Sequence, residues 1–575
     1  MKLFEKWRRN KTWDKYYTKE EMDVEVPDTS IYGLFSENVA KYEKYNAIEY
    51  FGKTITYQHL KELVDKCARS LQFEGIGEDD VVTICMPNVP EALIAFLAIN
   101  KVGAIANMIH PLSGEEEIKH YLSSTNSKML MMIDIAYEKV KAVISSTNVK
   151  RVVVVSAKDS MPFWMSVGYF VTKGYKVKHA KGARYIYWED FMLKSYRVQK
   201  NPGIMRKKDD IAAILHSGGT TGNPKGILLT NQAFNYMTCQ ETHIVPNIVP
   251  GDALLAIMPN FHGFGLGVCL IGPLSMGAKV IMVPQFSPKT FGDLVMKTKP
   301  QIVVGVPTLF GAMIDAKLKN EDMSFVKYCV SGGDSLSPSM YNRLKDFLRE
   351  HGAGDADVLQ GYGMTECLAA CSVMHGKTKD IYSIGVPLYG NEMKIVVPGT
   401  QDEVKPGESG EICLSGPSVM VGYLNNKKET NDVLQVHKDK KIWLHTGDSG
   451  YMSEDGIFHF ELRIKRMIVS SGYNVYPSHI EEVLEQHPAV LKSTVIGIPH
   501  KYKVQVAKAY IVLDEGYDDS WGIKKSIKEH CEKHLAAYSV PYEYEFRKSL
   551  PTTRLGKVNF KQLEEESKSG KHEED

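Results

Sequence analysis

The feature that most constrains the fold is a regular alternation of short apolar runs and amphipathic stretches over residues 31–397. Residues 81–85 have the pattern of a buried strand, residues 90–102 that of a helix, and residues 152–155 that of another strand. Strands that alternate with helices in this way are typical of a sheet covered by helices on both faces. We therefore expect an α/β fold with doubly wound sheets.

The pattern changes over about residues 381–460. The apolar runs become short there, and Gly/Pro turns such as residues 405–407 and 414–417 interrupt them. Short strands between frequent turns are typical of small barrels. We expect a β-rich, barrel-like subdomain in this stretch, as the last section of an N-terminal domain that covers residues 1–464.

Beyond Arg463 the pattern restarts with two helices and two strands. These elements are expected at residues 478–487, 493–498, 507–513 and 522–535. A unit of roughly 110 residues is large enough to fold on its own. We expect a small α+β domain over residues 465–575, with a polar and disordered tail from residue 564.

Composition excludes several classes of protein. Of the 575 residues, 43% are hydrophobic and 24% are charged, as in a soluble protein with an ample core. The net charge of +1 argues against a nucleic-acid-binding protein, which usually has a strongly basic face. The nine cysteines form no CxxC pair and fit free thiols of a reducing compartment. There is neither a signal-peptide core nor an apolar run of about 18 residues, so we expect a cytoplasmic protein.

Two segments, residues 1–20 and residues 161–184, combine basic and aromatic side chains. Such segments can rest on an acidic membrane surface as a peripheral contact. A half-buried helix with a solvated basic edge explains the same pattern, and we favour it. The sequence leaves both peripheral membrane contact and a homodimer open.

Residues 215–226, LHSGGTTGNPKG, follow the apolar run 211–215 and form the most informative loop of the chain. Glycines let backbone N–H groups approach an anion closely, while hydroxyl groups and Lys225 add donors and positive charge. The loop is not a Walker A motif, because that motif ends in Gly-Lys-Ser/Thr. We favour a polyphosphate-binding loop over a flexible linker.

This loop resembles the phosphate-binding signature of the adenylate-forming (AMP-binding) superfamily, which includes acyl-CoA synthetases, adenylation domains of peptide synthetases and luciferases. The resemblance implies that the loop holds the β- and γ-phosphates of ATP, and that Thr221 helps to hold a metal ion. His216 stands where the family usually has an aromatic residue. The ATP contacts implied in this loop are Ser217, Gly218, Gly219, Thr220, Thr221, Gly222 and Lys225.

Residues 360–366, QGYGMTE, follow another strand-like run. Glycines on both sides of Tyr362 would let its ring stack on a flat base, and the Glu366 carboxylate is a hard oxygen ligand suited to Mg²⁺. The segment resembles the second signature of the superfamily. That resemblance implies that Tyr362 stacks on adenine, that Thr365 contacts the α-phosphate and that Glu366 holds the metal. Gln360, Gly361 and Gly363 are further ATP contacts that it implies.

Two other segments resemble nucleotide-binding signatures of the family. Residues 331–335, SGGDS, resemble the loop at the edge of adenine and imply contacts from Gly333, Asp334 and Ser335. Asp334 could receive the adenine amino group or cap the next helix. Residues 445–448, HTGD, resemble the ribose-binding motif.

A carboxylate at Asp448 can accept hydrogen bonds from both ribose hydroxyls, although an Asp after Gly is also a common turn residue. The resemblance implies that Arg463 also reaches the ribose. It places a hinge at Lys465, about which the C-terminal domain would move as a lid. The family usually has Gly or Asp before this arginine, where this chain has Leu462.

The C-terminal segment 550–558, LPTTRLGKV, resembles the last signature of the family. It implies that Lys557 binds both the substrate carboxylate and the α-phosphate. After the domain turns, the loop 470–474 would guide the pantetheine of CoA. The CoA contacts implied are Ser471, Gly472 and Tyr473.

Residues 259–267, PNFHGFGLG, resemble the start of the family's acyl pocket. His262 would lie beside the carboxylate as a gate, where amino-acid-activating relatives carry an Asp. Glycines in this segment would leave room for an apolar tunnel, or they would serve close packing. The pocket residues implied are Phe261, Gly263, Phe264, Gly265 and Gly305.

Together these segments make the chain most similar to long-chain fatty acid:CoA ligases. The resemblance implies an acid–thiol ligase that uses ATP, Mg²⁺ and CoA. It would activate a medium- to long-chain fatty acid as acyl-AMP and transfer the acyl group to CoA, with release of AMP and pyrophosphate. An aromatic or bile acid, a carrier-protein acceptor and a non-catalytic nucleotide-binding regulator stay open as alternatives.

Overall fold

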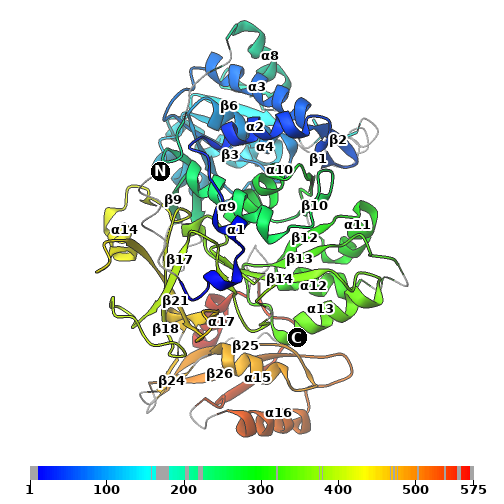
Figure 1. Cartoon of the computed structure of the whole chain (residues 1–575), viewed down its shortest axis with the longest axis vertical. Coiled ribbons are helices and arrows are strands. Elements are labelled where there is room, and N and C mark those ends of the chain that lie inside the picture. Colours follow the sequence, from blue (N-terminus) through cyan, green and yellow to red (C-terminus); the bar gives the residue numbers. More distant parts are fainter. Residues whose placement is uncertain are drawn as a thin grey trace.

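The structure, a computed structural model, has a large N-terminal part and a small C-terminal part (Figure 1). Its α/β class, with mixed sheets and a small C-terminal α+β unit, confirms the fold class expected from the sequence. The structure describes residues 11–156, 158–162, 180–200, 202, 206–217, 224–285, 287–316, 318, 321–374, 376–378, 380–466, 468–470, 473–475, 477–500, 504–535, 539–552 and 558–569.

The first large sheet has eight strands in the order β19-β9-β8-β4-β3-β5-β6-β7. The strands from β8 to β7 are parallel, whereas β9 and β19 join antiparallel to the edge. They are β3 (Val81–Cys85), β4 (Ile105–Met108), β5 (Met129–Ile133), β6 (Arg151–Val155), β7 (Tyr185–Tyr187), β8 (Ile211–Ser217), β9 (Lys225–Thr230) and β19 (Gly422–Tyr423).

The second large sheet has nine strands in the order β16-β15-β14-β13-β12-β10-β11-β1-β2. Its six central strands, from β14 to β1, are parallel. The strands are β1 (Asn46–Tyr50), β2 (Lys53–Thr56), β10 (Ala253–Ala256), β11 (Lys279–Met282), β12 (Ile302–Gly305), β13 (Tyr328–Ser331), β14 (Asp357–Tyr362), β15 (Ser372–Val373) and β16 (Val386–Pro387).

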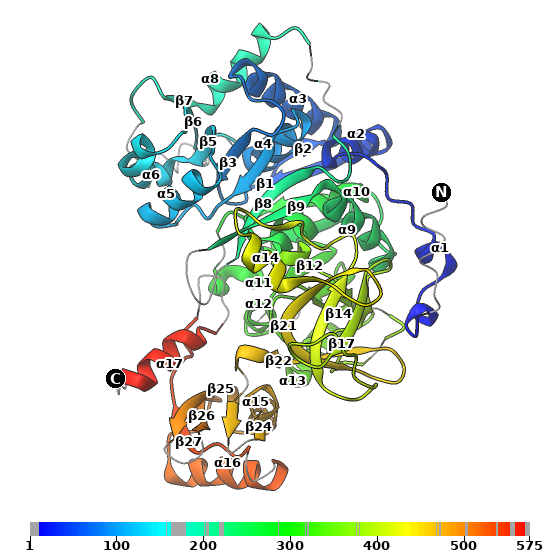
Figure 2. The same ribbon diagram turned by 90° about the vertical axis from the view of Figure 1, so that its left-hand side faces the viewer.

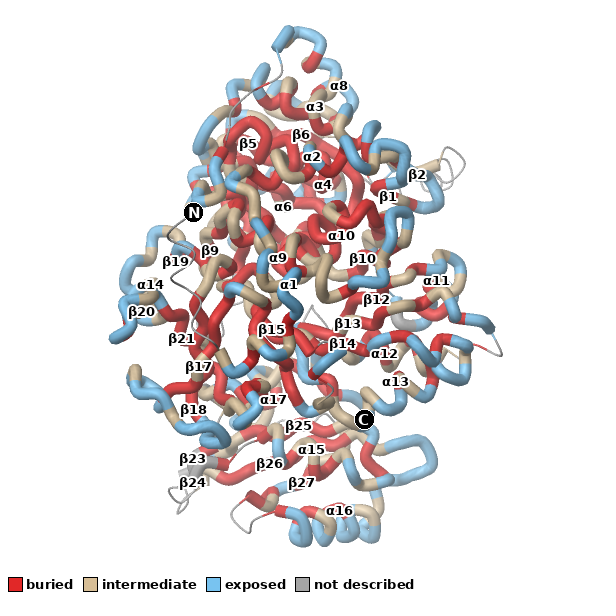
Figure 3. The backbone as a smooth tube through the Cα atoms, viewed as in Figure 1, coloured by how far each residue is buried: buried red, intermediate tan, exposed pale blue. Residues whose placement is uncertain are grey.

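Helices cover both large sheets, and strands of both sheets are buried (Figure 3). All twelve residues of α4 are buried, which fits the mostly apolar sequence of its middle, residues 92–99. The helices α11 to α13 enclose a separate apolar cluster on one face of the nine-stranded sheet. The main helices of this part are α2 (Ile31–Tyr42), α3 (Tyr57–Phe73), α4 (Pro90–Lys101), α5 (Glu115–Ser124), α6 (Tyr137–Val143), α8 (Trp188–Leu193), α9 (Asn231–Ile244), α10 (Gly272–Ser275), α11 (Phe291–Thr298), α12 (Pro307–Ile314) and α13 (Pro338–Glu350).

A third, antiparallel sheet forms the β-rich unit, in the order β17-β18-β21-β20 with β22 paired to β21. Its elements are β17 (Glu392–Val396), β18 (Gly410–Ser415), α14 (Lys427–Val433), β20 (Leu434–Val436), β21 (Ile442–Met452) and β22 (Phe458–Arg463). β22 leads through the 3₁₀ turn η10 (Ile464–Arg466) directly into the C-terminal part.

The N-terminal segment packs against the β-rich unit. Trp13 is buried, and its ring meets that of Phe458 edge-on with centroids 5.6 Å apart. Lys11 Nζ lies 2.7 Å from Glu392 Oε2. The Trp13 side chain is therefore part of the protein core rather than an aromatic side chain free to meet a membrane.

Most of the other basic and aromatic segment, residues 163–179, lies outside the described ranges. Among the helices of the described ranges, none has the length and apolar character needed to cross a lipid bilayer.

In its described residues, the C-terminal part has a fourth sheet, in the order β24-β23-β26-β25 with β27 paired to β26, and the three helices α15, α16 and α17. The helix α17 (Phe560–Ser569) contradicts the expectation that the tail is disordered from residue 564, and Figure 2 shows it beside this sheet. Its Leu563 is fully buried, and Arg547 Nη1 donates to Glu566 Oε2 at 2.7 Å. The other elements are β23 (Ile468–Ser470), β24 (Tyr473–Val475), α15 (Pro477–Glu485), β25 (Val490–His500), β26 (Val504–Leu513), α16 (Trp521–His534) and β27 (Glu543–Phe546).

Candidate active site

Three of the nucleotide-contacting residues expected from the sequence meet at the end of β14. The Tyr362 hydroxyl donates to Asp448 Oδ2 at 2.8 Å, and Arg463 Nε lies 3.4 Å from Asp448 Oδ1. Asp448 and Arg463 are direct partners in the β21–β22 ladder. Burial raises the pKa of the Tyr362 phenol well above its ordinary value, and the Asp448 charge adds to this. The phenol therefore stays protonated and holds one oxygen of the carboxylate in place.

The loop after β13 is held by Gln360 of the neighbouring strand. Gln360 Oε1 accepts the Leu336 N–H at 2.9 Å, and its Nε2 donates to the Ser383 carbonyl at 2.9 Å. Gln360 is buried, so its amide shapes the loop that presents Gly333, Asp334 and Ser335, all three of which are exposed. The alternative that Asp334 caps the next helix is wrong, because the N-cap of α13 is Ser337.

A second cluster lies where β19 meets the start of β9. Tyr423 pairs with Ile227 of β9, and its hydroxyl donates to Glu366 Oε1 at 2.9 Å. Lys225 Nζ lies 4.8 Å from the centre of the Tyr423 ring and forms an ion pair with Glu429. One tyrosine thus connects the lysine of the glycine-rich loop with the predicted metal-binding carboxylate.

Tyr423 and Glu429 are residues that the sequence analysis missed. Tyr423 lies 57 positions from Glu366, and nothing in its own neighbourhood in the sequence distinguishes it from a core tyrosine. The antiparallel pairing of β19 with β9 brings Tyr423 to the start of β9, and the backbone hydrogen bond from Met420 to Glu366 holds that glutamate beside β19.

The segment predicted to begin the acyl pocket forms a π-helix, η7 (Phe264–Ile271), an element frequently found at functional sites. A Cβ built on Gly263 would lie 1.3 Å from the backbone oxygen of Leu368, and one on Gly265 would lie 2.0 Å from that of Pro259. These two glycines serve close packing, so the expectation that they leave room for a tunnel is wrong.

Two of the other predicted pocket residues, Phe261 and His262, come just before this helix, and Phe264 is its first residue. His262 is half-buried, and its ring centre lies 4.9 Å from that of Phe261. The backbone N–H of His262 donates to the Pro259 carbonyl. A Cβ on Gly332 would lie 3.1 Å from Cζ of Phe264, so Phe264 lies against the loop after β13. Gly305 ends β12, and a Cβ there would lie 2.2 Å from Cδ2 of Leu309.

His216 has a structural explanation. Its ring lies 4.3 Å, centre to centre, from that of Tyr121, and its Nε2 donates to Asn107 Oδ1 at 2.6 Å. Burial lowers the pKa of His216 to about 3, so the ring stays neutral. A neutral imidazole here packs like the aromatic residue it replaces.

The remaining predicted residues are only partly described. Lys465 lies in η10, between the β-rich unit and the C-terminal sheet, and Tyr473 begins β24. Thr365 opens the 3₁₀ turn that follows β14. Outside the described residues lie the predicted positions Gly218, Gly219, Thr220, Thr221, Gly222, Ser471, Gly472 and Lys557.

The model of the AMP-binding enzyme family matches residues 35–424, and that of the AMP-binding enzyme C-terminal domain matches residues 479–557. The chain belongs to the AMP-binding enzyme family. Among this family, the chain is 30% identical to a long-chain-fatty-acid–CoA ligase of Bacillus subtilis, over 96% of this chain and 97% of the relative. It is 31% identical to a long-chain-fatty-acid–CoA ligase of Haemophilus influenzae, over 94% and 96%.

The fold of this family is also found in a solved anthranilate CoA ligase in complex with anthranoyl-AMP. The TM-score is 0.80 at 23% identity, and the match covers 96% of this chain and 99% of that one. These findings confirm the family and the enzyme class inferred from the sequence: the AMP-binding enzyme described here is an acyl-CoA ligase. ATP and CoA as substrates fit this family.

Proposed function

We propose that the enzyme joins a medium- to long-chain fatty acid to CoA through an acyl-AMP intermediate. The observation that carries this proposal is that the segment 362–366 joins two clusters, Tyr362–Asp448–Arg463 and Lys225–Tyr423–Glu366, while Leu368 just beyond it packs against Gly263 at the start of the π-helix η7. The first suits a nucleoside and the second suits a polyphosphate. The full-length relatives that are named for long-chain fatty acids support the choice of acid.

In the first step, a carboxylate oxygen attacks the α-phosphorus of ATP, and the bond to pyrophosphate breaks. Two anions repel each other, so the residues around them must offset negative charge as it moves to the leaving group. Lys557 and Thr365 would act at the α-phosphate, and the 217–225 loop would hold the pyrophosphate. Asp448 and Arg463 would fix the ribose.

In the second step, the CoA thiol loses its proton to solvent, its sulfur attacks the acyl carbonyl carbon, and AMP leaves with the bonding electron pair. The C-terminal domain would first turn about Lys465, withdrawing Lys557 and bringing in Ser471, Gly472 and Tyr473. No side-chain nucleophile is needed in either step.

The Glu366 carboxylate fits a magnesium site. Mg²⁺ usually takes one or two protein carboxylates together with phosphate oxygens. Glu366 is half-exposed, and Tyr423 fixes one of its oxygens at 2.9 Å. Glu366, with Thr221, would hold the ion, which when bound neutralises charge on the triphosphate.

A CoA-ligation panel tests the choice of acid. We expect thioester formation from fatty acids of medium to long chain to exceed that from benzoate, anthranilate and cholate, measured as AMP release that depends on both acid and CoA. Higher kcat/KM for an aromatic acid or a bile acid would replace this proposal with the corresponding ligase. Release that occurs with an acyl carrier protein but not with CoA would change the acceptor, and no ATP–pyrophosphate exchange with any acid would favour a nucleotide-binding regulator.

Tyr423→Phe removes only the hydroxyl that holds Glu366 and keeps the ring beside Lys225. A hydrogen bond to a charged group contributes about 1.5–3 kcal/mol, so the Mg²⁺ concentration for half-maximal adenylation should rise at least about tenfold. The Mg²⁺-dependent binding of ATP, measured by calorimetry in the absence of the fatty acid, should weaken in parallel. An unchanged metal dependence would show that the Tyr423 hydroxyl does not position Glu366.

A further inference from the structure

The turn that carries Asp448 is a bulge in the β18–β21 ladder. Glu411 pairs with Ser449, and Cys413 pairs with His445. Between these pairs, Ile412 alone faces the three residues Thr446, Gly447 and Asp448. Bulges re-aim side chains and are over-represented next to active sites. Here the bulge directs Asp448 to Tyr362.

One buried carboxylate holds both sides of this bulge. Glu411 Oε1 accepts the Gly447 N–H at 3.0 Å, and Glu411 Oε2 accepts Nδ1–H of His445 at 2.9 Å. Gly447 has φ +71°, a left-handed conformation that glycine adopts without a steric penalty. Although burial raises it, the pKa of Glu411 is lowered overall by the hydrogen bond from His445, so the acceptor stays ionised.

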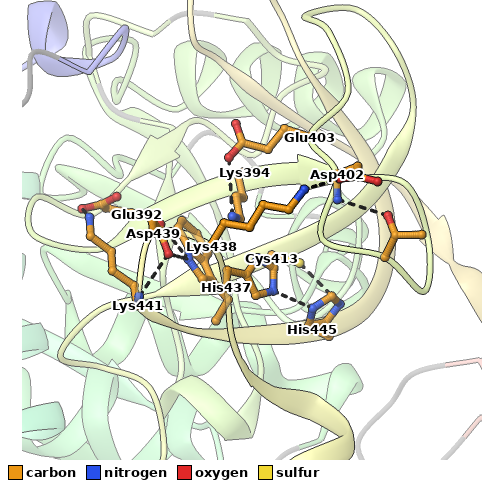
Figure 4. Close-up of polar contacts among 12 residues, drawn as sticks. Glu392, Lys394, Asp402, Glu403, Cys413, His437, Lys438, Asp439, Lys441 and His445 are labelled. Atoms are coloured by element: carbon orange, nitrogen blue, oxygen red, sulfur yellow. Dashed lines mark hydrogen bonds and ion pairs between the residues drawn. The ribbon is translucent and has the colours of Figure 1, made fainter.

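The chain of hydrogen bonds continues to His437. Nε2 of His437 lies 2.9 Å from Nε2 of His445. A dashed line marks this contact in Figure 4. Because Nδ1–H of His445 donates a hydrogen bond to Glu411, its Nε2 accepts a hydrogen bond from Nε2–H of His437. His437 is itself buried and lies beside Trp443, with ring centres 5.9 Å apart.

We propose that Glu411, which His445 and His437 hold in place, positions the Asp448 carboxylate for the ribose hydroxyls of ATP through the hydrogen bond that it accepts from the Gly447 N–H. These are positioning residues, since Glu411 and His437 act through the bulge and touch no substrate. The inference rests on the proposed function, because it takes Asp448 as the acceptor for the ribose. It explains why three ionisable side chains are buried together away from the reacting groups.

The test compares ATP with 2′,3′-dideoxyATP, which lacks both hydroxyls, at saturating fatty acid and CoA. For Glu411→Gln, one oxygen remains for Gly447, but an amide group now faces the His445 N–H. We expect kcat/KM for ATP to fall at least about fivefold, with the value for 2′,3′-dideoxyATP unchanged. The preference for ATP should therefore shrink by the same factor.

A merely structural role would lower both values equally, and that result would overturn the inference. The control is Glu403→Gln, which removes the carboxylate that lies 3.4 Å from Lys394 Nζ of β17, a pair that Figure 4 shows. Glu403 lies in the connection between β17 and β18. This variant should leave the preference for ATP unchanged. A preference lost equally in both variants would also overturn the inference.

A second pair of variants, at His437, tests the inference even if Glu411→Gln does not fold. His437→Gln retains a donor for His445, whereas His437→Leu does not. We expect the preference for ATP to be kept by the first and reduced about threefold by the second. Equal preferences in both would overturn the role of His437.

Two outcomes distinguish this inference from the proposed function and from a metal site. A wild-type enzyme that forms no acyl-CoA, or that uses both nucleotides equally well, would overturn the proposed function itself. One zinc ion per chain in the wild type, absent from Cys413→Ser, would overturn the inference in favour of metal binding, because Cys413, Glu411 and His445 have ligand atoms close enough to share an ion.

Discussion

The Lys557→Ala variant is expected to lose adenylation about a hundredfold or more while still converting supplied acyl-AMP into the thioester. The charge of this lysine would be needed only while the carboxylate attacks the α-phosphate. In the second step the C-terminal domain would have turned about Lys465, which lies in the short turn between β22 and β23. Pyrophosphate exchange and thioester formation from acyl-AMP measure the two steps separately.

The matched control for this variant is Lys561→Ala, four positions further along the chain. Lys561 is exposed on α17, so its removal should leave both half-reactions near the wild-type rates. If Lys557→Ala reduced both half-reactions equally, the assignment of Lys557 to one of two domain arrangements would be wrong.

Glu366→Gln should reduce ATP–pyrophosphate exchange about a hundredfold and raise the Mg²⁺ requirement. The amide keeps the size of the side chain and can still accept the hydrogen bond from Tyr423, but it lacks the negative charge that Mg²⁺ prefers. A titration of exchange rate against Mg²⁺ concentration measures both effects.

Glu429→Gln is the control, since Glu429 is a nearby carboxylate that pairs with Lys225. This ion pair is half-exposed, and surface pairs contribute only ~0–1 kcal/mol, so the exchange rate of Glu429→Gln should stay within about fivefold of the wild type. Equal losses in Glu366→Gln and Glu429→Gln would show that Glu366 has no special part in holding the metal.

Local patterns were sufficient to predict much of the fold. The apolar runs 81–85 and 211–215 correspond to the strands β3 and β8, and the helix expected at residues 90–102 is α4. These elements depend on the spacing of apolar residues, which the sequence displays directly. The tail was predicted wrongly because the burial of Leu563 comes from packing against the C-terminal sheet, and no local pattern reports that.

The site divides in the same way. Tyr362 and Asp448 could be found from their own motifs, although 86 positions separate them, and the structure brings them into contact. Glu411 and Tyr423 could not be found from the sequence, because their roles depend on hydrogen bonds to residues that are distant in the sequence and close only in the folded sheets. The space beside Gly263 was also unpredictable, since the backbone of Leu368 fills it.

The packing of Trp13 on Phe458 has a consequence for synthesis on the ribosome. The N-terminal segment is made first, yet its partner strand β22 is made more than four hundred residues later. At roughly 5–20 residues per second, the indole ring waits about 20 to 90 s for its binding surface. During that interval the nascent chain carries an uncovered aromatic side chain near its start, which makes this segment a natural contact for a chaperone.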